Sequence, residues 1–262
     1  MHRLIVPGAQ LHFATEGTTG PWVTLVNGYT RPMTDFKFLS KSLVQSGFRC
    51  LMFDNRGSGI TGVDRAFSSD EMASDIFALW RHLNIDRSSL LGISMGGVIC
   101  QKAASVEPER ITKLCLISTT GDDAFVNLIT EPWGTDTEKI VERLRLYVTE
   151  GFFRSNHLLI EAMAKQISRS VETGTFEQSA AMQRAAFPTY RTTDILSRLK
   201  MPTLIIHGKE DRVIAPTAAE QLHQHLPHSK LIVLEEAGHL LLAESSQALR
   251  REILDFLTSE PI

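Results

Sequence analysis

The stretch Leu90–Gly97, LLGISMGG, places one serine between glycines where an apolar run gives way to a helical pattern. The spacing Gly92-x-Ser94-x-Gly96 is typical of a sharp strand-to-helix turn that lifts the serine hydroxyl above a sheet edge. Such a turn strains its central residue, and the flanking glycines let the two backbones approach closely. It also places the N–H of Met95 at a helix N-terminus, where a backbone donor stabilises an oxyanion. The pattern is short enough to arise by chance, so its meaning depends on the rest of the chain.

Short apolar runs alternate with amphipathic patterns on both sides of this turn. Strands are expected at residues 22–28, 48–59 (ending in a glycine-rich loop), 88–94, 111–119, 202–208 and 230–238, and helices at 33–47, 68–84, 95–107, 217–226 and 245–259. Ser68 stands three residues before Glu71, which is typical of a capping box. The alternation predicts an α/β fold, with a parallel sheet covered by helices on both faces. Ligands of such sheets bind beyond the carboxyl ends of the strands.

The alternation stops between residues 122 and 199, where only helical patterns occur. Apolar residues fit one helical face at Ile140, Leu144, Tyr147 and Val148 and another at Leu159, Met163 and Ile167. We therefore expect a core of residues 1–121 and 200–262, with residues 122–199 inserted as a helical cap. The insertion has two interpretations, which are additional packing of the core and a lid over an active site.

A serine hydroxyl is a weak nucleophile unless a base removes its proton, so a histidine is needed at the same sheet edge. His239 follows the last expected strand by a short glycine-containing loop, which predicts that it lies near Ser94. His207 ends the strand at 202–208 and is the main alternative, although a structural role is the favoured interpretation for it. Three further histidines, His223, His225 and His228, cluster around one helix without a coherent set of ligands, so no metal site is predicted.

The base requires a carboxylate that orients its ring and stabilises the imidazolium. Asp211 follows the strand at 202–208 directly and is the favoured candidate, while the adjacent Glu210 is expected to point elsewhere. Asp122 and Asp123 follow an earlier strand and are the reserve candidates, because that strand edge is also within reach. The resulting chain order of serine, aspartate and histidine is the order expected for a hydrolase on this type of sheet.

The composition narrows the class of protein. A net charge of −3 argues against a general nucleic-acid binder, and 43% hydrophobic residues is ordinary for a globular chain that needs neither disulfides nor metals. Cys50, Cys100 and Cys115 lie far apart in apolar runs, which predicts buried thiols in a reducing compartment. The N-terminus has too few apolar residues for a signal sequence and no apolar run reaches about 18 residues, so we expect a cytoplasmic protein without a membrane span. The oligomeric state is left open.

Five segments together resemble the α/β-hydrolase superfamily along nearly the whole chain, namely LVNGYT, FDNRGSG, GISMGG, PTLIIHGKEDRVIAP and EEAGHLLLAE. The resemblance implies an eight-stranded, mostly parallel sheet with a helical cap inserted after the sixth strand. It also implies that the loop after LVNG supplies a second oxyanion donor, which falls on the backbone N–H of Tyr29. Relatives usually carry His-Gly where this chain has Asn27 and Gly28, so the chain departs from the family pattern in this loop. FDNRGSG is interpreted as structural.

Together these residues predict a serine hydrolase, with Ser94 as nucleophile, His239 as base and Asp211 as its partner. The expected substrate is a small to mid-sized apolar ester or lactone, cleaved through an acyl-enzyme without any cofactor. Ser94 argues against the dehalogenases and epoxide hydrolases of this superfamily, which resemble the fold but carry aspartate at the turn. The alternatives that stay open are carbon–carbon bond hydrolysis, an aminopeptidase or perhydrolysis on the same triad, and a ligand receptor with slow turnover.

The substrate pocket is predicted from residues beside the catalytic positions and from aromatic residues of the cap. The candidates are Leu240, Phe125, Trp133 and Phe187. The aromatic members favour an apolar substrate. The alternative interpretation is that these aromatic side chains hold the cap against the sheet.

Overall fold

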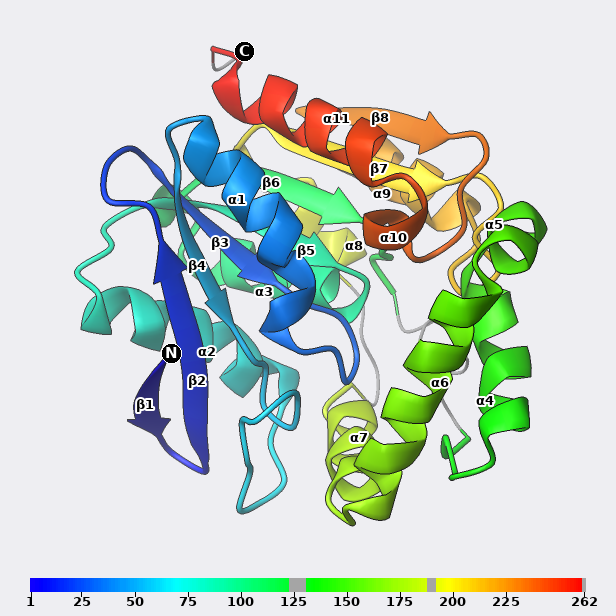
Figure 1. Ribbon diagram of the computed structural model, residues 1–262. Coiled ribbons are helices and arrows are strands. Elements are labelled where there is room, and N and C mark those ends of the chain that lie inside the picture. Colours follow the sequence, from blue (N-terminus) through cyan, green and yellow to red (C-terminus); the bar gives the residue numbers. More distant parts are fainter. Residues whose placement is uncertain (123–130, 188–191, 261–262) are drawn as a thin grey trace.

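A mostly parallel sheet of eight strands forms the centre of the part of the chain that the structure describes (Figure 1). The computed structural model describes residues 1–122, 131–187 and 192–260. The strands are β1 (His2–Val6), β2 (Ala9–Glu16), β3 (Trp22–Val26), β4 (Arg49–Phe53), β5 (Ser88–Ile93), β6 (Ile111–Ile117), β7 (Thr203–Gly208) and β8 (Ser229–Leu234). Their order is β1-β2-β4-β3-β5-β6-β7-β8; the pairs β1–β2 and β2–β4 are antiparallel and the others parallel. The fold class expected from the sequence is confirmed.

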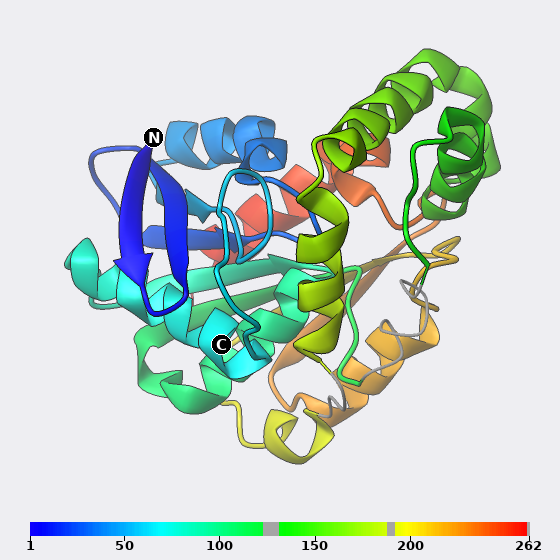
Figure 2. The same cartoon turned by 90° about the horizontal axis from the view of Figure 1, so that it is seen from below.

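Helices cover both faces of this sheet, with α1 and α11 on one face and α2, α3 and α9 on the other (Figure 2). The helices are α1 (Lys37–Gln45), α2 (Ser69–His82), α3 (Met95–Val106), α4 (Thr137–Leu144), α5 (Glu150–Ser155), α6 (His157–Glu172), α7 (Phe176–Ala185), α8 (Thr193–Leu196), α9 (Thr217–His225), α10 (Leu241–Glu244) and α11 (Ser246–Thr258). Short 3-10 turns occur at η1 (Met33–Phe36), η2 (Pro108–Arg110) and η4 (Arg145–Tyr147).

Two layers of apolar side chains, one on each face of the sheet, form the core. In β5 the side chain of Leu90 enters the layer shared with α2 and α3, and that of Leu91 enters the layer shared with α1 and α11. The same alternation occurs in β6 at Leu114 and Cys115. Successive residues of a strand point to opposite faces, and both faces are buried here. The central strands are therefore continuous apolar runs in the sequence.

The capping box expected at the start of α2 is present. The Ser68 hydroxyl accepts a hydrogen bond from the Glu71 N–H (3.3 Å), and the Glu71 carboxylate accepts one from the Ser68 N–H (3.0 Å). Further along α2, the buried Trp80 donates from Nε1 to the Thr24 hydroxyl of β3 (2.8 Å). The helix is thus fixed at its start by local hydrogen bonds and along its length by burial against the sheet.

The N-terminal hairpin of β1 and β2 is the part of the sheet that the apolar pattern did not indicate. β1 is the outermost strand, and three of its five residues are exposed. β2 alternates buried residues such as Leu11 and Phe13 with half-buried ones. An edge strand that buries little produces a weak apolar signal, which is why these strands came only from the family resemblance.

Helices α4 to α7 follow β6 and lie beyond the carboxyl ends of the central strands (Figure 1). A separate apolar cluster that includes Ile140, Leu144 and Ile160 joins α4 to α6. The expected apolar face of α6 is wrong by one position at its start, since Leu159 is 45% exposed whereas Ile160 is buried. The helical pattern identified the helix, but only packing selects which of two adjacent apolar residues faces inward.

We propose that the chain is divided as its sequence predicts, into a core of residues 1–121 and 200–262 and a cap of residues 122–199. It is supported by the apolar cluster between α4 and α6, which is distinct from the two layers against the sheet. α8 differs from the other helices of this interval, because it packs against α3 and α9.

The three cysteines, Cys50, Cys100 and Cys115, are free and buried, as expected. Burial raises the pKa of each thiol, to about 12 for Cys50, which keeps all three unreactive at neutral pH. Among the described residues, none of the helices combines the length and apolar character that crossing a membrane requires.

Candidate active site

Ser94 stands where the strand order of the sheet reverses. From β3 the chain passes to β4 on one side and then to β5 on the other. Val26 pairs with Gly92 in the register of the sheet, which brings the loop after β3 and Ser94 to the same edge. In open α/β sheets this switch point is where ligands bind.

The turn at Ser94 is strained, as its sequence predicts. Ser94 adopts φ 54° and ψ −123°, a positive-φ conformation that residues with side chains rarely occupy. A Cβ on Gly97 would lie 2.6 Å from the Thr119 side chain, and a Cβ on Gly96 would strike the backbone at the end of β3. The Ser94 carbonyl accepts hydrogen bonds from the Thr119 hydroxyl (2.7 Å) and the Gly97 N–H (2.9 Å). Glycines are therefore required for clearance, and these bonds hold the strained residue.

The structure brings together Ser94, His239 and Asp211, the three residues predicted to form the triad. Nε2 of His239 lies 3.1 Å from Oγ of Ser94, and its Nδ1 lies 2.8 Å from Oδ2 of Asp211. His239 and Asp211 are only 5% and 4% exposed. Because the carboxylate accepts at Nδ1, that nitrogen carries the proton and Nε2 presents a lone pair to the serine hydroxyl.

Four N–H groups hold the side chain of Asp211. Oδ1 accepts from the N–H of Val213 (2.8 Å) and of Ile214 (2.9 Å). Oδ2 accepts from His239 and, at 3.2 Å, from Nε2 of His207. Burial by itself would raise the pKa of Asp211, but the charge of His239 and the hydrogen bonds from both histidines hold this pKa well below its usual range. Asp211 is therefore a fixed carboxylate that orients the His239 ring.

His207 supports Asp211 and does not replace His239. It is fully buried in β7, and its Nε2 also lies 2.9 Å from the carbonyl oxygen of Ile214. A carbonyl oxygen only accepts, so Nε2 carries the proton and shares it between Ile214 and Asp211. Nδ1 of His207 is buried without a partner among the described residues, and an N–H there would be left unsatisfied. The ring therefore donates from Nε2 alone.

The other described candidates for acid and base are exposed or are held within their own turn. Glu210 is exposed, and Asp122 accepts a hydrogen bond from the Thr120 hydroxyl (2.8 Å) within its own turn. Asp123 lies outside the described residues. His223, His225 and His228 are exposed on or just after α9. Within the described ranges, no group of three His, Cys, Asp or Glu side chains could hold a metal ion.

The two residues expected to supply oxyanion donors adjoin the serine along the chain or through Gly28. Met95 is the first residue of α3, so its N–H has no acceptor within the helix. Gly28 lies against Ser94, since a Cβ on Gly28 would be 3.2 Å from the Ser94 Cβ, and Tyr29 follows it. Two backbone N–H groups directed at one oxygen stabilise a tetrahedral oxyanion, and Met95 and Tyr29 stay the predicted pair.

Asn27, where relatives usually have histidine, anchors the loop that carries Tyr29. Its Nδ2 donates to the Pro32 carbonyl (2.7 Å) and to Asp35 Oδ2 (3.1 Å), and its Oδ1 accepts from the Gly28 N–H (2.8 Å). The side chain is buried and both of its polar atoms are paired. Asparagine thus closes this loop by its own hydrogen bonds, so the departure from the family pattern leaves an ordered donor loop.

A buried glutamine ties α7 to the same loop. Gln183 accepts from the Thr30 N–H (2.8 Å) and donates to the Arg56 carbonyl (2.7 Å) and the Ser58 hydroxyl (2.8 Å). Arg56 makes two buried hydrogen bonds to Asp75, at 2.7 and 2.8 Å, consistent with a structural role for FDNRGSG. The oxyanion loop, the FDNRGSG loop and α7 are therefore joined at one residue.

Tyr147 and Glu244 hold the loop that carries His239. The N–H groups of His239 and Leu240 donate to the Tyr147 carbonyl (2.9 and 3.1 Å), and the Tyr147 ring lies edge-on to the His239 ring at 5.7 Å. Glu244 accepts from the Thr149 N–H (2.8 Å) and from the N–H just before His239 (3.1 Å). The position of the base thus depends on the segment between α4 and α6.

The structure places the predicted pocket residues in different parts of the protein. Leu240 and Trp133 both pack against the cluster between α4 and α6, and the Trp133 ring lies 6.0 Å from that of Tyr147. Phe187 is 1% exposed in the core layer shared with α2 and α3. Phe125 lies outside the described residues. Leu240 and Trp133 are therefore the pocket candidates that the structure places near His239.

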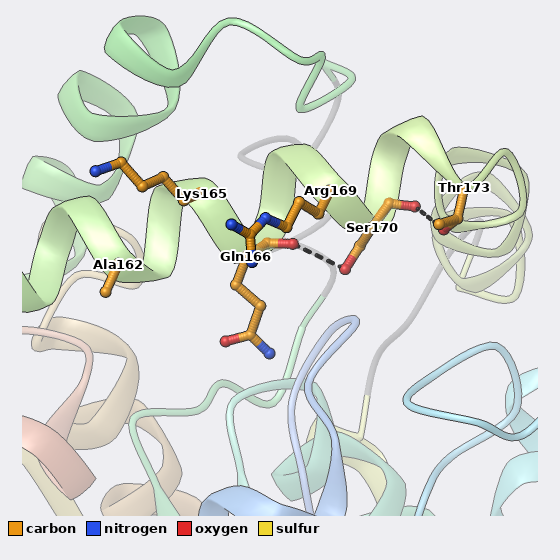
Figure 3. Close-up of a pocket in the computed structure, with 6 residues that line it drawn as sticks. All are labelled: Ala162, Lys165, Gln166, Arg169, Ser170 and Thr173. Carbon is orange, nitrogen blue, oxygen red and sulfur yellow. Dashed lines mark hydrogen bonds between the residues drawn. The ribbon is translucent and has the colours of Figure 1, made fainter.

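A hollow of about 600 Å³ lies along α6 (Figure 3). It is lined by Ala162, Lys165, Gln166, Arg169, Ser170 and Thr173. These residues share one flank of a single helix and include none of the predicted site residues. The hydrogen-bonded residues Ser94, His239 and Asp211 therefore stay the candidate active site.

Sequence reasoning missed Gln183, Tyr147 and Glu244. Gln183 and Tyr147 belong to none of the quoted segments, and Glu244 is the last residue of EEAGHLLLAE, whose pattern does not indicate a contact with the loop that carries His239. Asn27 and His207 lie at the ends of predicted strands and were named from the sequence. Their hydrogen-bond partners were found only in the structure.

The chain is similar to known hydrolases over most of its length. Residues 19–246 match a family model described as serine aminopeptidase, S33. A 2-hydroxy-6-oxononadienedioate/2-hydroxy-6-oxononatrienedioate hydrolase of Pseudomonas putida is 27% identical, covering 95% of this chain and 91% of that protein. The pimeloyl-[acyl-carrier protein] methyl ester esterase of Nitrosomonas europaea is 27% identical, covering 88% and 93%. A solved thermophilic esterase from Thermogutta terrifontis is 26% identical with a TM-score of 0.83, covering 98% of each chain.

Proposed function

Because the chain belongs to the S33 serine aminopeptidase family of the α/β-hydrolase superfamily, we propose that it is a serine hydrolase that cleaves a carboxylic ester or lactone. The observation that carries the proposal is the continuous hydrogen-bonded series from Ser94 through His239 to Asp211. The position of Met95 at the start of α3 and that of Tyr29 next to Gly28, which lies against Ser94, support it. The similarity to two esterases supports ester chemistry within the family.

Acylation begins when Nε2 of His239 takes the proton of Ser94 as Oγ attacks the carbonyl carbon. The N–H groups of Tyr29 and Met95 donate to the oxyanion of the tetrahedral intermediate. Asp211 stabilises the imidazolium through Nδ1. The intermediate collapses when its bond to the leaving oxygen breaks, and Nε2 returns the proton to that oxygen.

Deacylation repeats these steps with water. Nε2 of His239 removes a proton from a water molecule, which attacks the acyl carbon and forms a second oxyanion at the same donors. Collapse releases the carboxylic acid and returns the proton to Oγ of Ser94. The cycle uses the side chains of Ser94, His239 and Asp211 together with two backbone N–H groups.

A second candidate is hydrolysis of a carbon–carbon bond by the same residues. It is favoured by the similarity to the Pseudomonas putida hydrolase, whose named substrate is a keto-dienedioic acid without an ester. The proton held at Nε2 of His239 would then pass to carbon. The two candidate reactions are separated by measuring kcat/KM for a dienedioic keto acid, for 4-nitrophenyl esters and for a lactone. The reaction that the enzyme catalyses is the one whose substrate class has the highest kcat/KM.

The test of the proposal is covalent labelling together with turnover. A fluorophosphonate should label the native protein at Ser94, and the label should be lost in both Ser94→Ala and His239→Ala. Ester turnover in Ser94→Ala should fall by roughly a million-fold, to the level that binding and the oxyanion donors alone provide. Melting curves establish that the variants fold. Full turnover by a folded Ser94→Ala variant would overturn the proposal.

A further inference from the structure

Two arginines of the cap segment act on tyrosines that adjoin the candidate active site. Arg184, next to the end of α7, donates from Nη1 to the hydroxyl of Tyr29 (2.7 Å). The charge of Arg143 acts on the hydroxyls of both Tyr29 and Tyr147. Tyr29 belongs to the oxyanion loop, and the Tyr147 ring lies against His239. Both positive charges are thus directed to the surroundings of the reacting pair.

Neither arginine pairs with a carboxylate within the described part of the chain. Arg143 lies 4.1 Å from the Trp133 ring and donates to two backbone carbonyls of its own segment (2.9 and 3.1 Å). Glu177 is the acidic group that acts on Tyr29, and its Oε1 already accepts from two backbone N–H groups, at 2.7 and 3.1 Å. A half-buried guanidinium such as Arg184, held by a neutral phenol, retains both charge and donors for a ligand.

Two neutral donors stand beside these charges. Burial raises the pKa of Tyr29 to about 12, against the opposing effect of Arg184, so its hydroxyl stays protonated in any ordinary assay. Its oxygen accepts from Arg184, which leaves its hydrogen for another acceptor. Nε1 of Trp133 is buried and has no acceptor among the described residues. A guanidinium beside a hydroxyl donor suits a planar anion with two oxygens, which is a carboxylate.

We propose that Arg184 and Tyr29, with Arg143 as a second positive charge, bind a carboxylate of the substrate. The substrate is then an ester or lactone that carries an ionised carboxyl group on an otherwise apolar chain. This specificity rests on the proposed hydrolase function, because it presupposes attack by Ser94. Leu240 and Trp133 provide the apolar surroundings between the two ends.

The first test compares matched substrates. Mono-(4-nitrophenyl) esters of glutarate, adipate, pimelate and suberate are offered beside 4-nitrophenyl esters of the neutral acids of equal length. We expect a preference for the charged ester of about 10- to 100-fold in kcat/KM at the best length, the range of one hydrogen bond to a charged group. A native enzyme that shows no preference at any length overturns the proposal.

The second test removes the guanidinium. Arg184→Met should lower kcat/KM for the charged ester by about 10- to 100-fold, mainly through KM. The neutral ester should lose much less, since it loses only the support that Arg184 gives to Tyr29. Arg184→Lys keeps the charge without the planar fork and should recover part of the preference. An equal loss for both esters would mean that Arg184 only supports the oxyanion loop, and would overturn the proposal.

The matched control is Arg169→Met on α6, where Arg169 lines the exposed hollow with Lys165 (Figure 3). It removes the same charge from the same segment without touching the tyrosines, so the preference should not change. An equal loss of preference in Arg169→Met would show general attraction by the cap, and would refute a specific site. Failure of the hydrolase function itself looks different, because neutral esters would then also be inert.

Discussion

Replacement of His207 by leucine would test whether this buried histidine acts through Asp211. The change removes one of four N–H donors from the carboxylate. A hydrogen bond to a charged group contributes about 1.5–3 kcal/mol. The Nε2–Oδ2 distance of 3.2 Å is long, and the proton is shared with the Ile214 carbonyl at 2.9 Å, so we expect the lower end of that range. Because the carboxylate is then held less firmly and orients the His239 ring less well, we expect a loss of about this size in the transition state, which is roughly a tenfold fall in kcat/KM.

The assay is the pH dependence of kcat/KM for a 4-nitrophenyl ester. With one donor fewer, Asp211 concentrates more negative charge toward His239 and stabilises the imidazolium more strongly. The acid limb of the profile should therefore move to higher pH. His207→Gln returns an N–H close to the Nε2 position and should recover part of the activity and of the pH profile.

A double-mutant cycle separates this role from packing. In the Asp211→Asn background the donor has lost its carboxylate, so His207→Leu should cost little more. Equal losses in both backgrounds, with no movement of the acid limb and no recovery in His207→Gln, would refute the reasoning. His207 would then serve only to fill the interior beside β7.

Replacement of Ser68 by alanine breaks the capping box with Glu71 and should lower the free energy of unfolding by about 1 kcal/mol in a urea titration, with esterase activity unchanged. Replacement of Gln183 by leucine leaves the Thr30 N–H and two other groups without their partner, at about 1–3 kcal/mol each. We expect a lower Tm and a fall in kcat that exceeds the rise in KM, and an unchanged kcat would contradict an anchoring role. The pKa of Asp211 is depressed in the folded state, so its contribution to the free energy of unfolding is complete above its unfolded pKa of about 4 and is lost as the pH falls through the folded pKa. The unfolding free energy of the native protein should thus fall more steeply below about pH 4 than that of Asp211→Asn, whereas parallel curves would count against this assignment.

Local sequence patterns determined the α/β core and the positions of the triad. The central strands are apolar on both faces, so each appears as a continuous run, and the elbow glycines stand within a few residues of Ser94. His239 and Asp211 are placed by chain order, because loops that follow parallel strands meet at one sheet edge. The apolar pattern did not predict strand β1, because most of its residues are exposed and it has no continuous run of buried apolar residues.

The contacts that support the site and surround the substrate were decided by tertiary packing. Thr30 and Gln183 are 153 residues apart, and Tyr29 and Arg184 are 155 apart, yet each pair is joined by a hydrogen bond. Periodicity indicates which face of a helix is apolar, but it does not specify how a cap helix docks on a distant loop. The sequence alone therefore predicts a nucleophile, a base and its carboxylate partner. The cations and donors proposed to select the substrate are brought together only by the packing of the cap segment against the loops of the core.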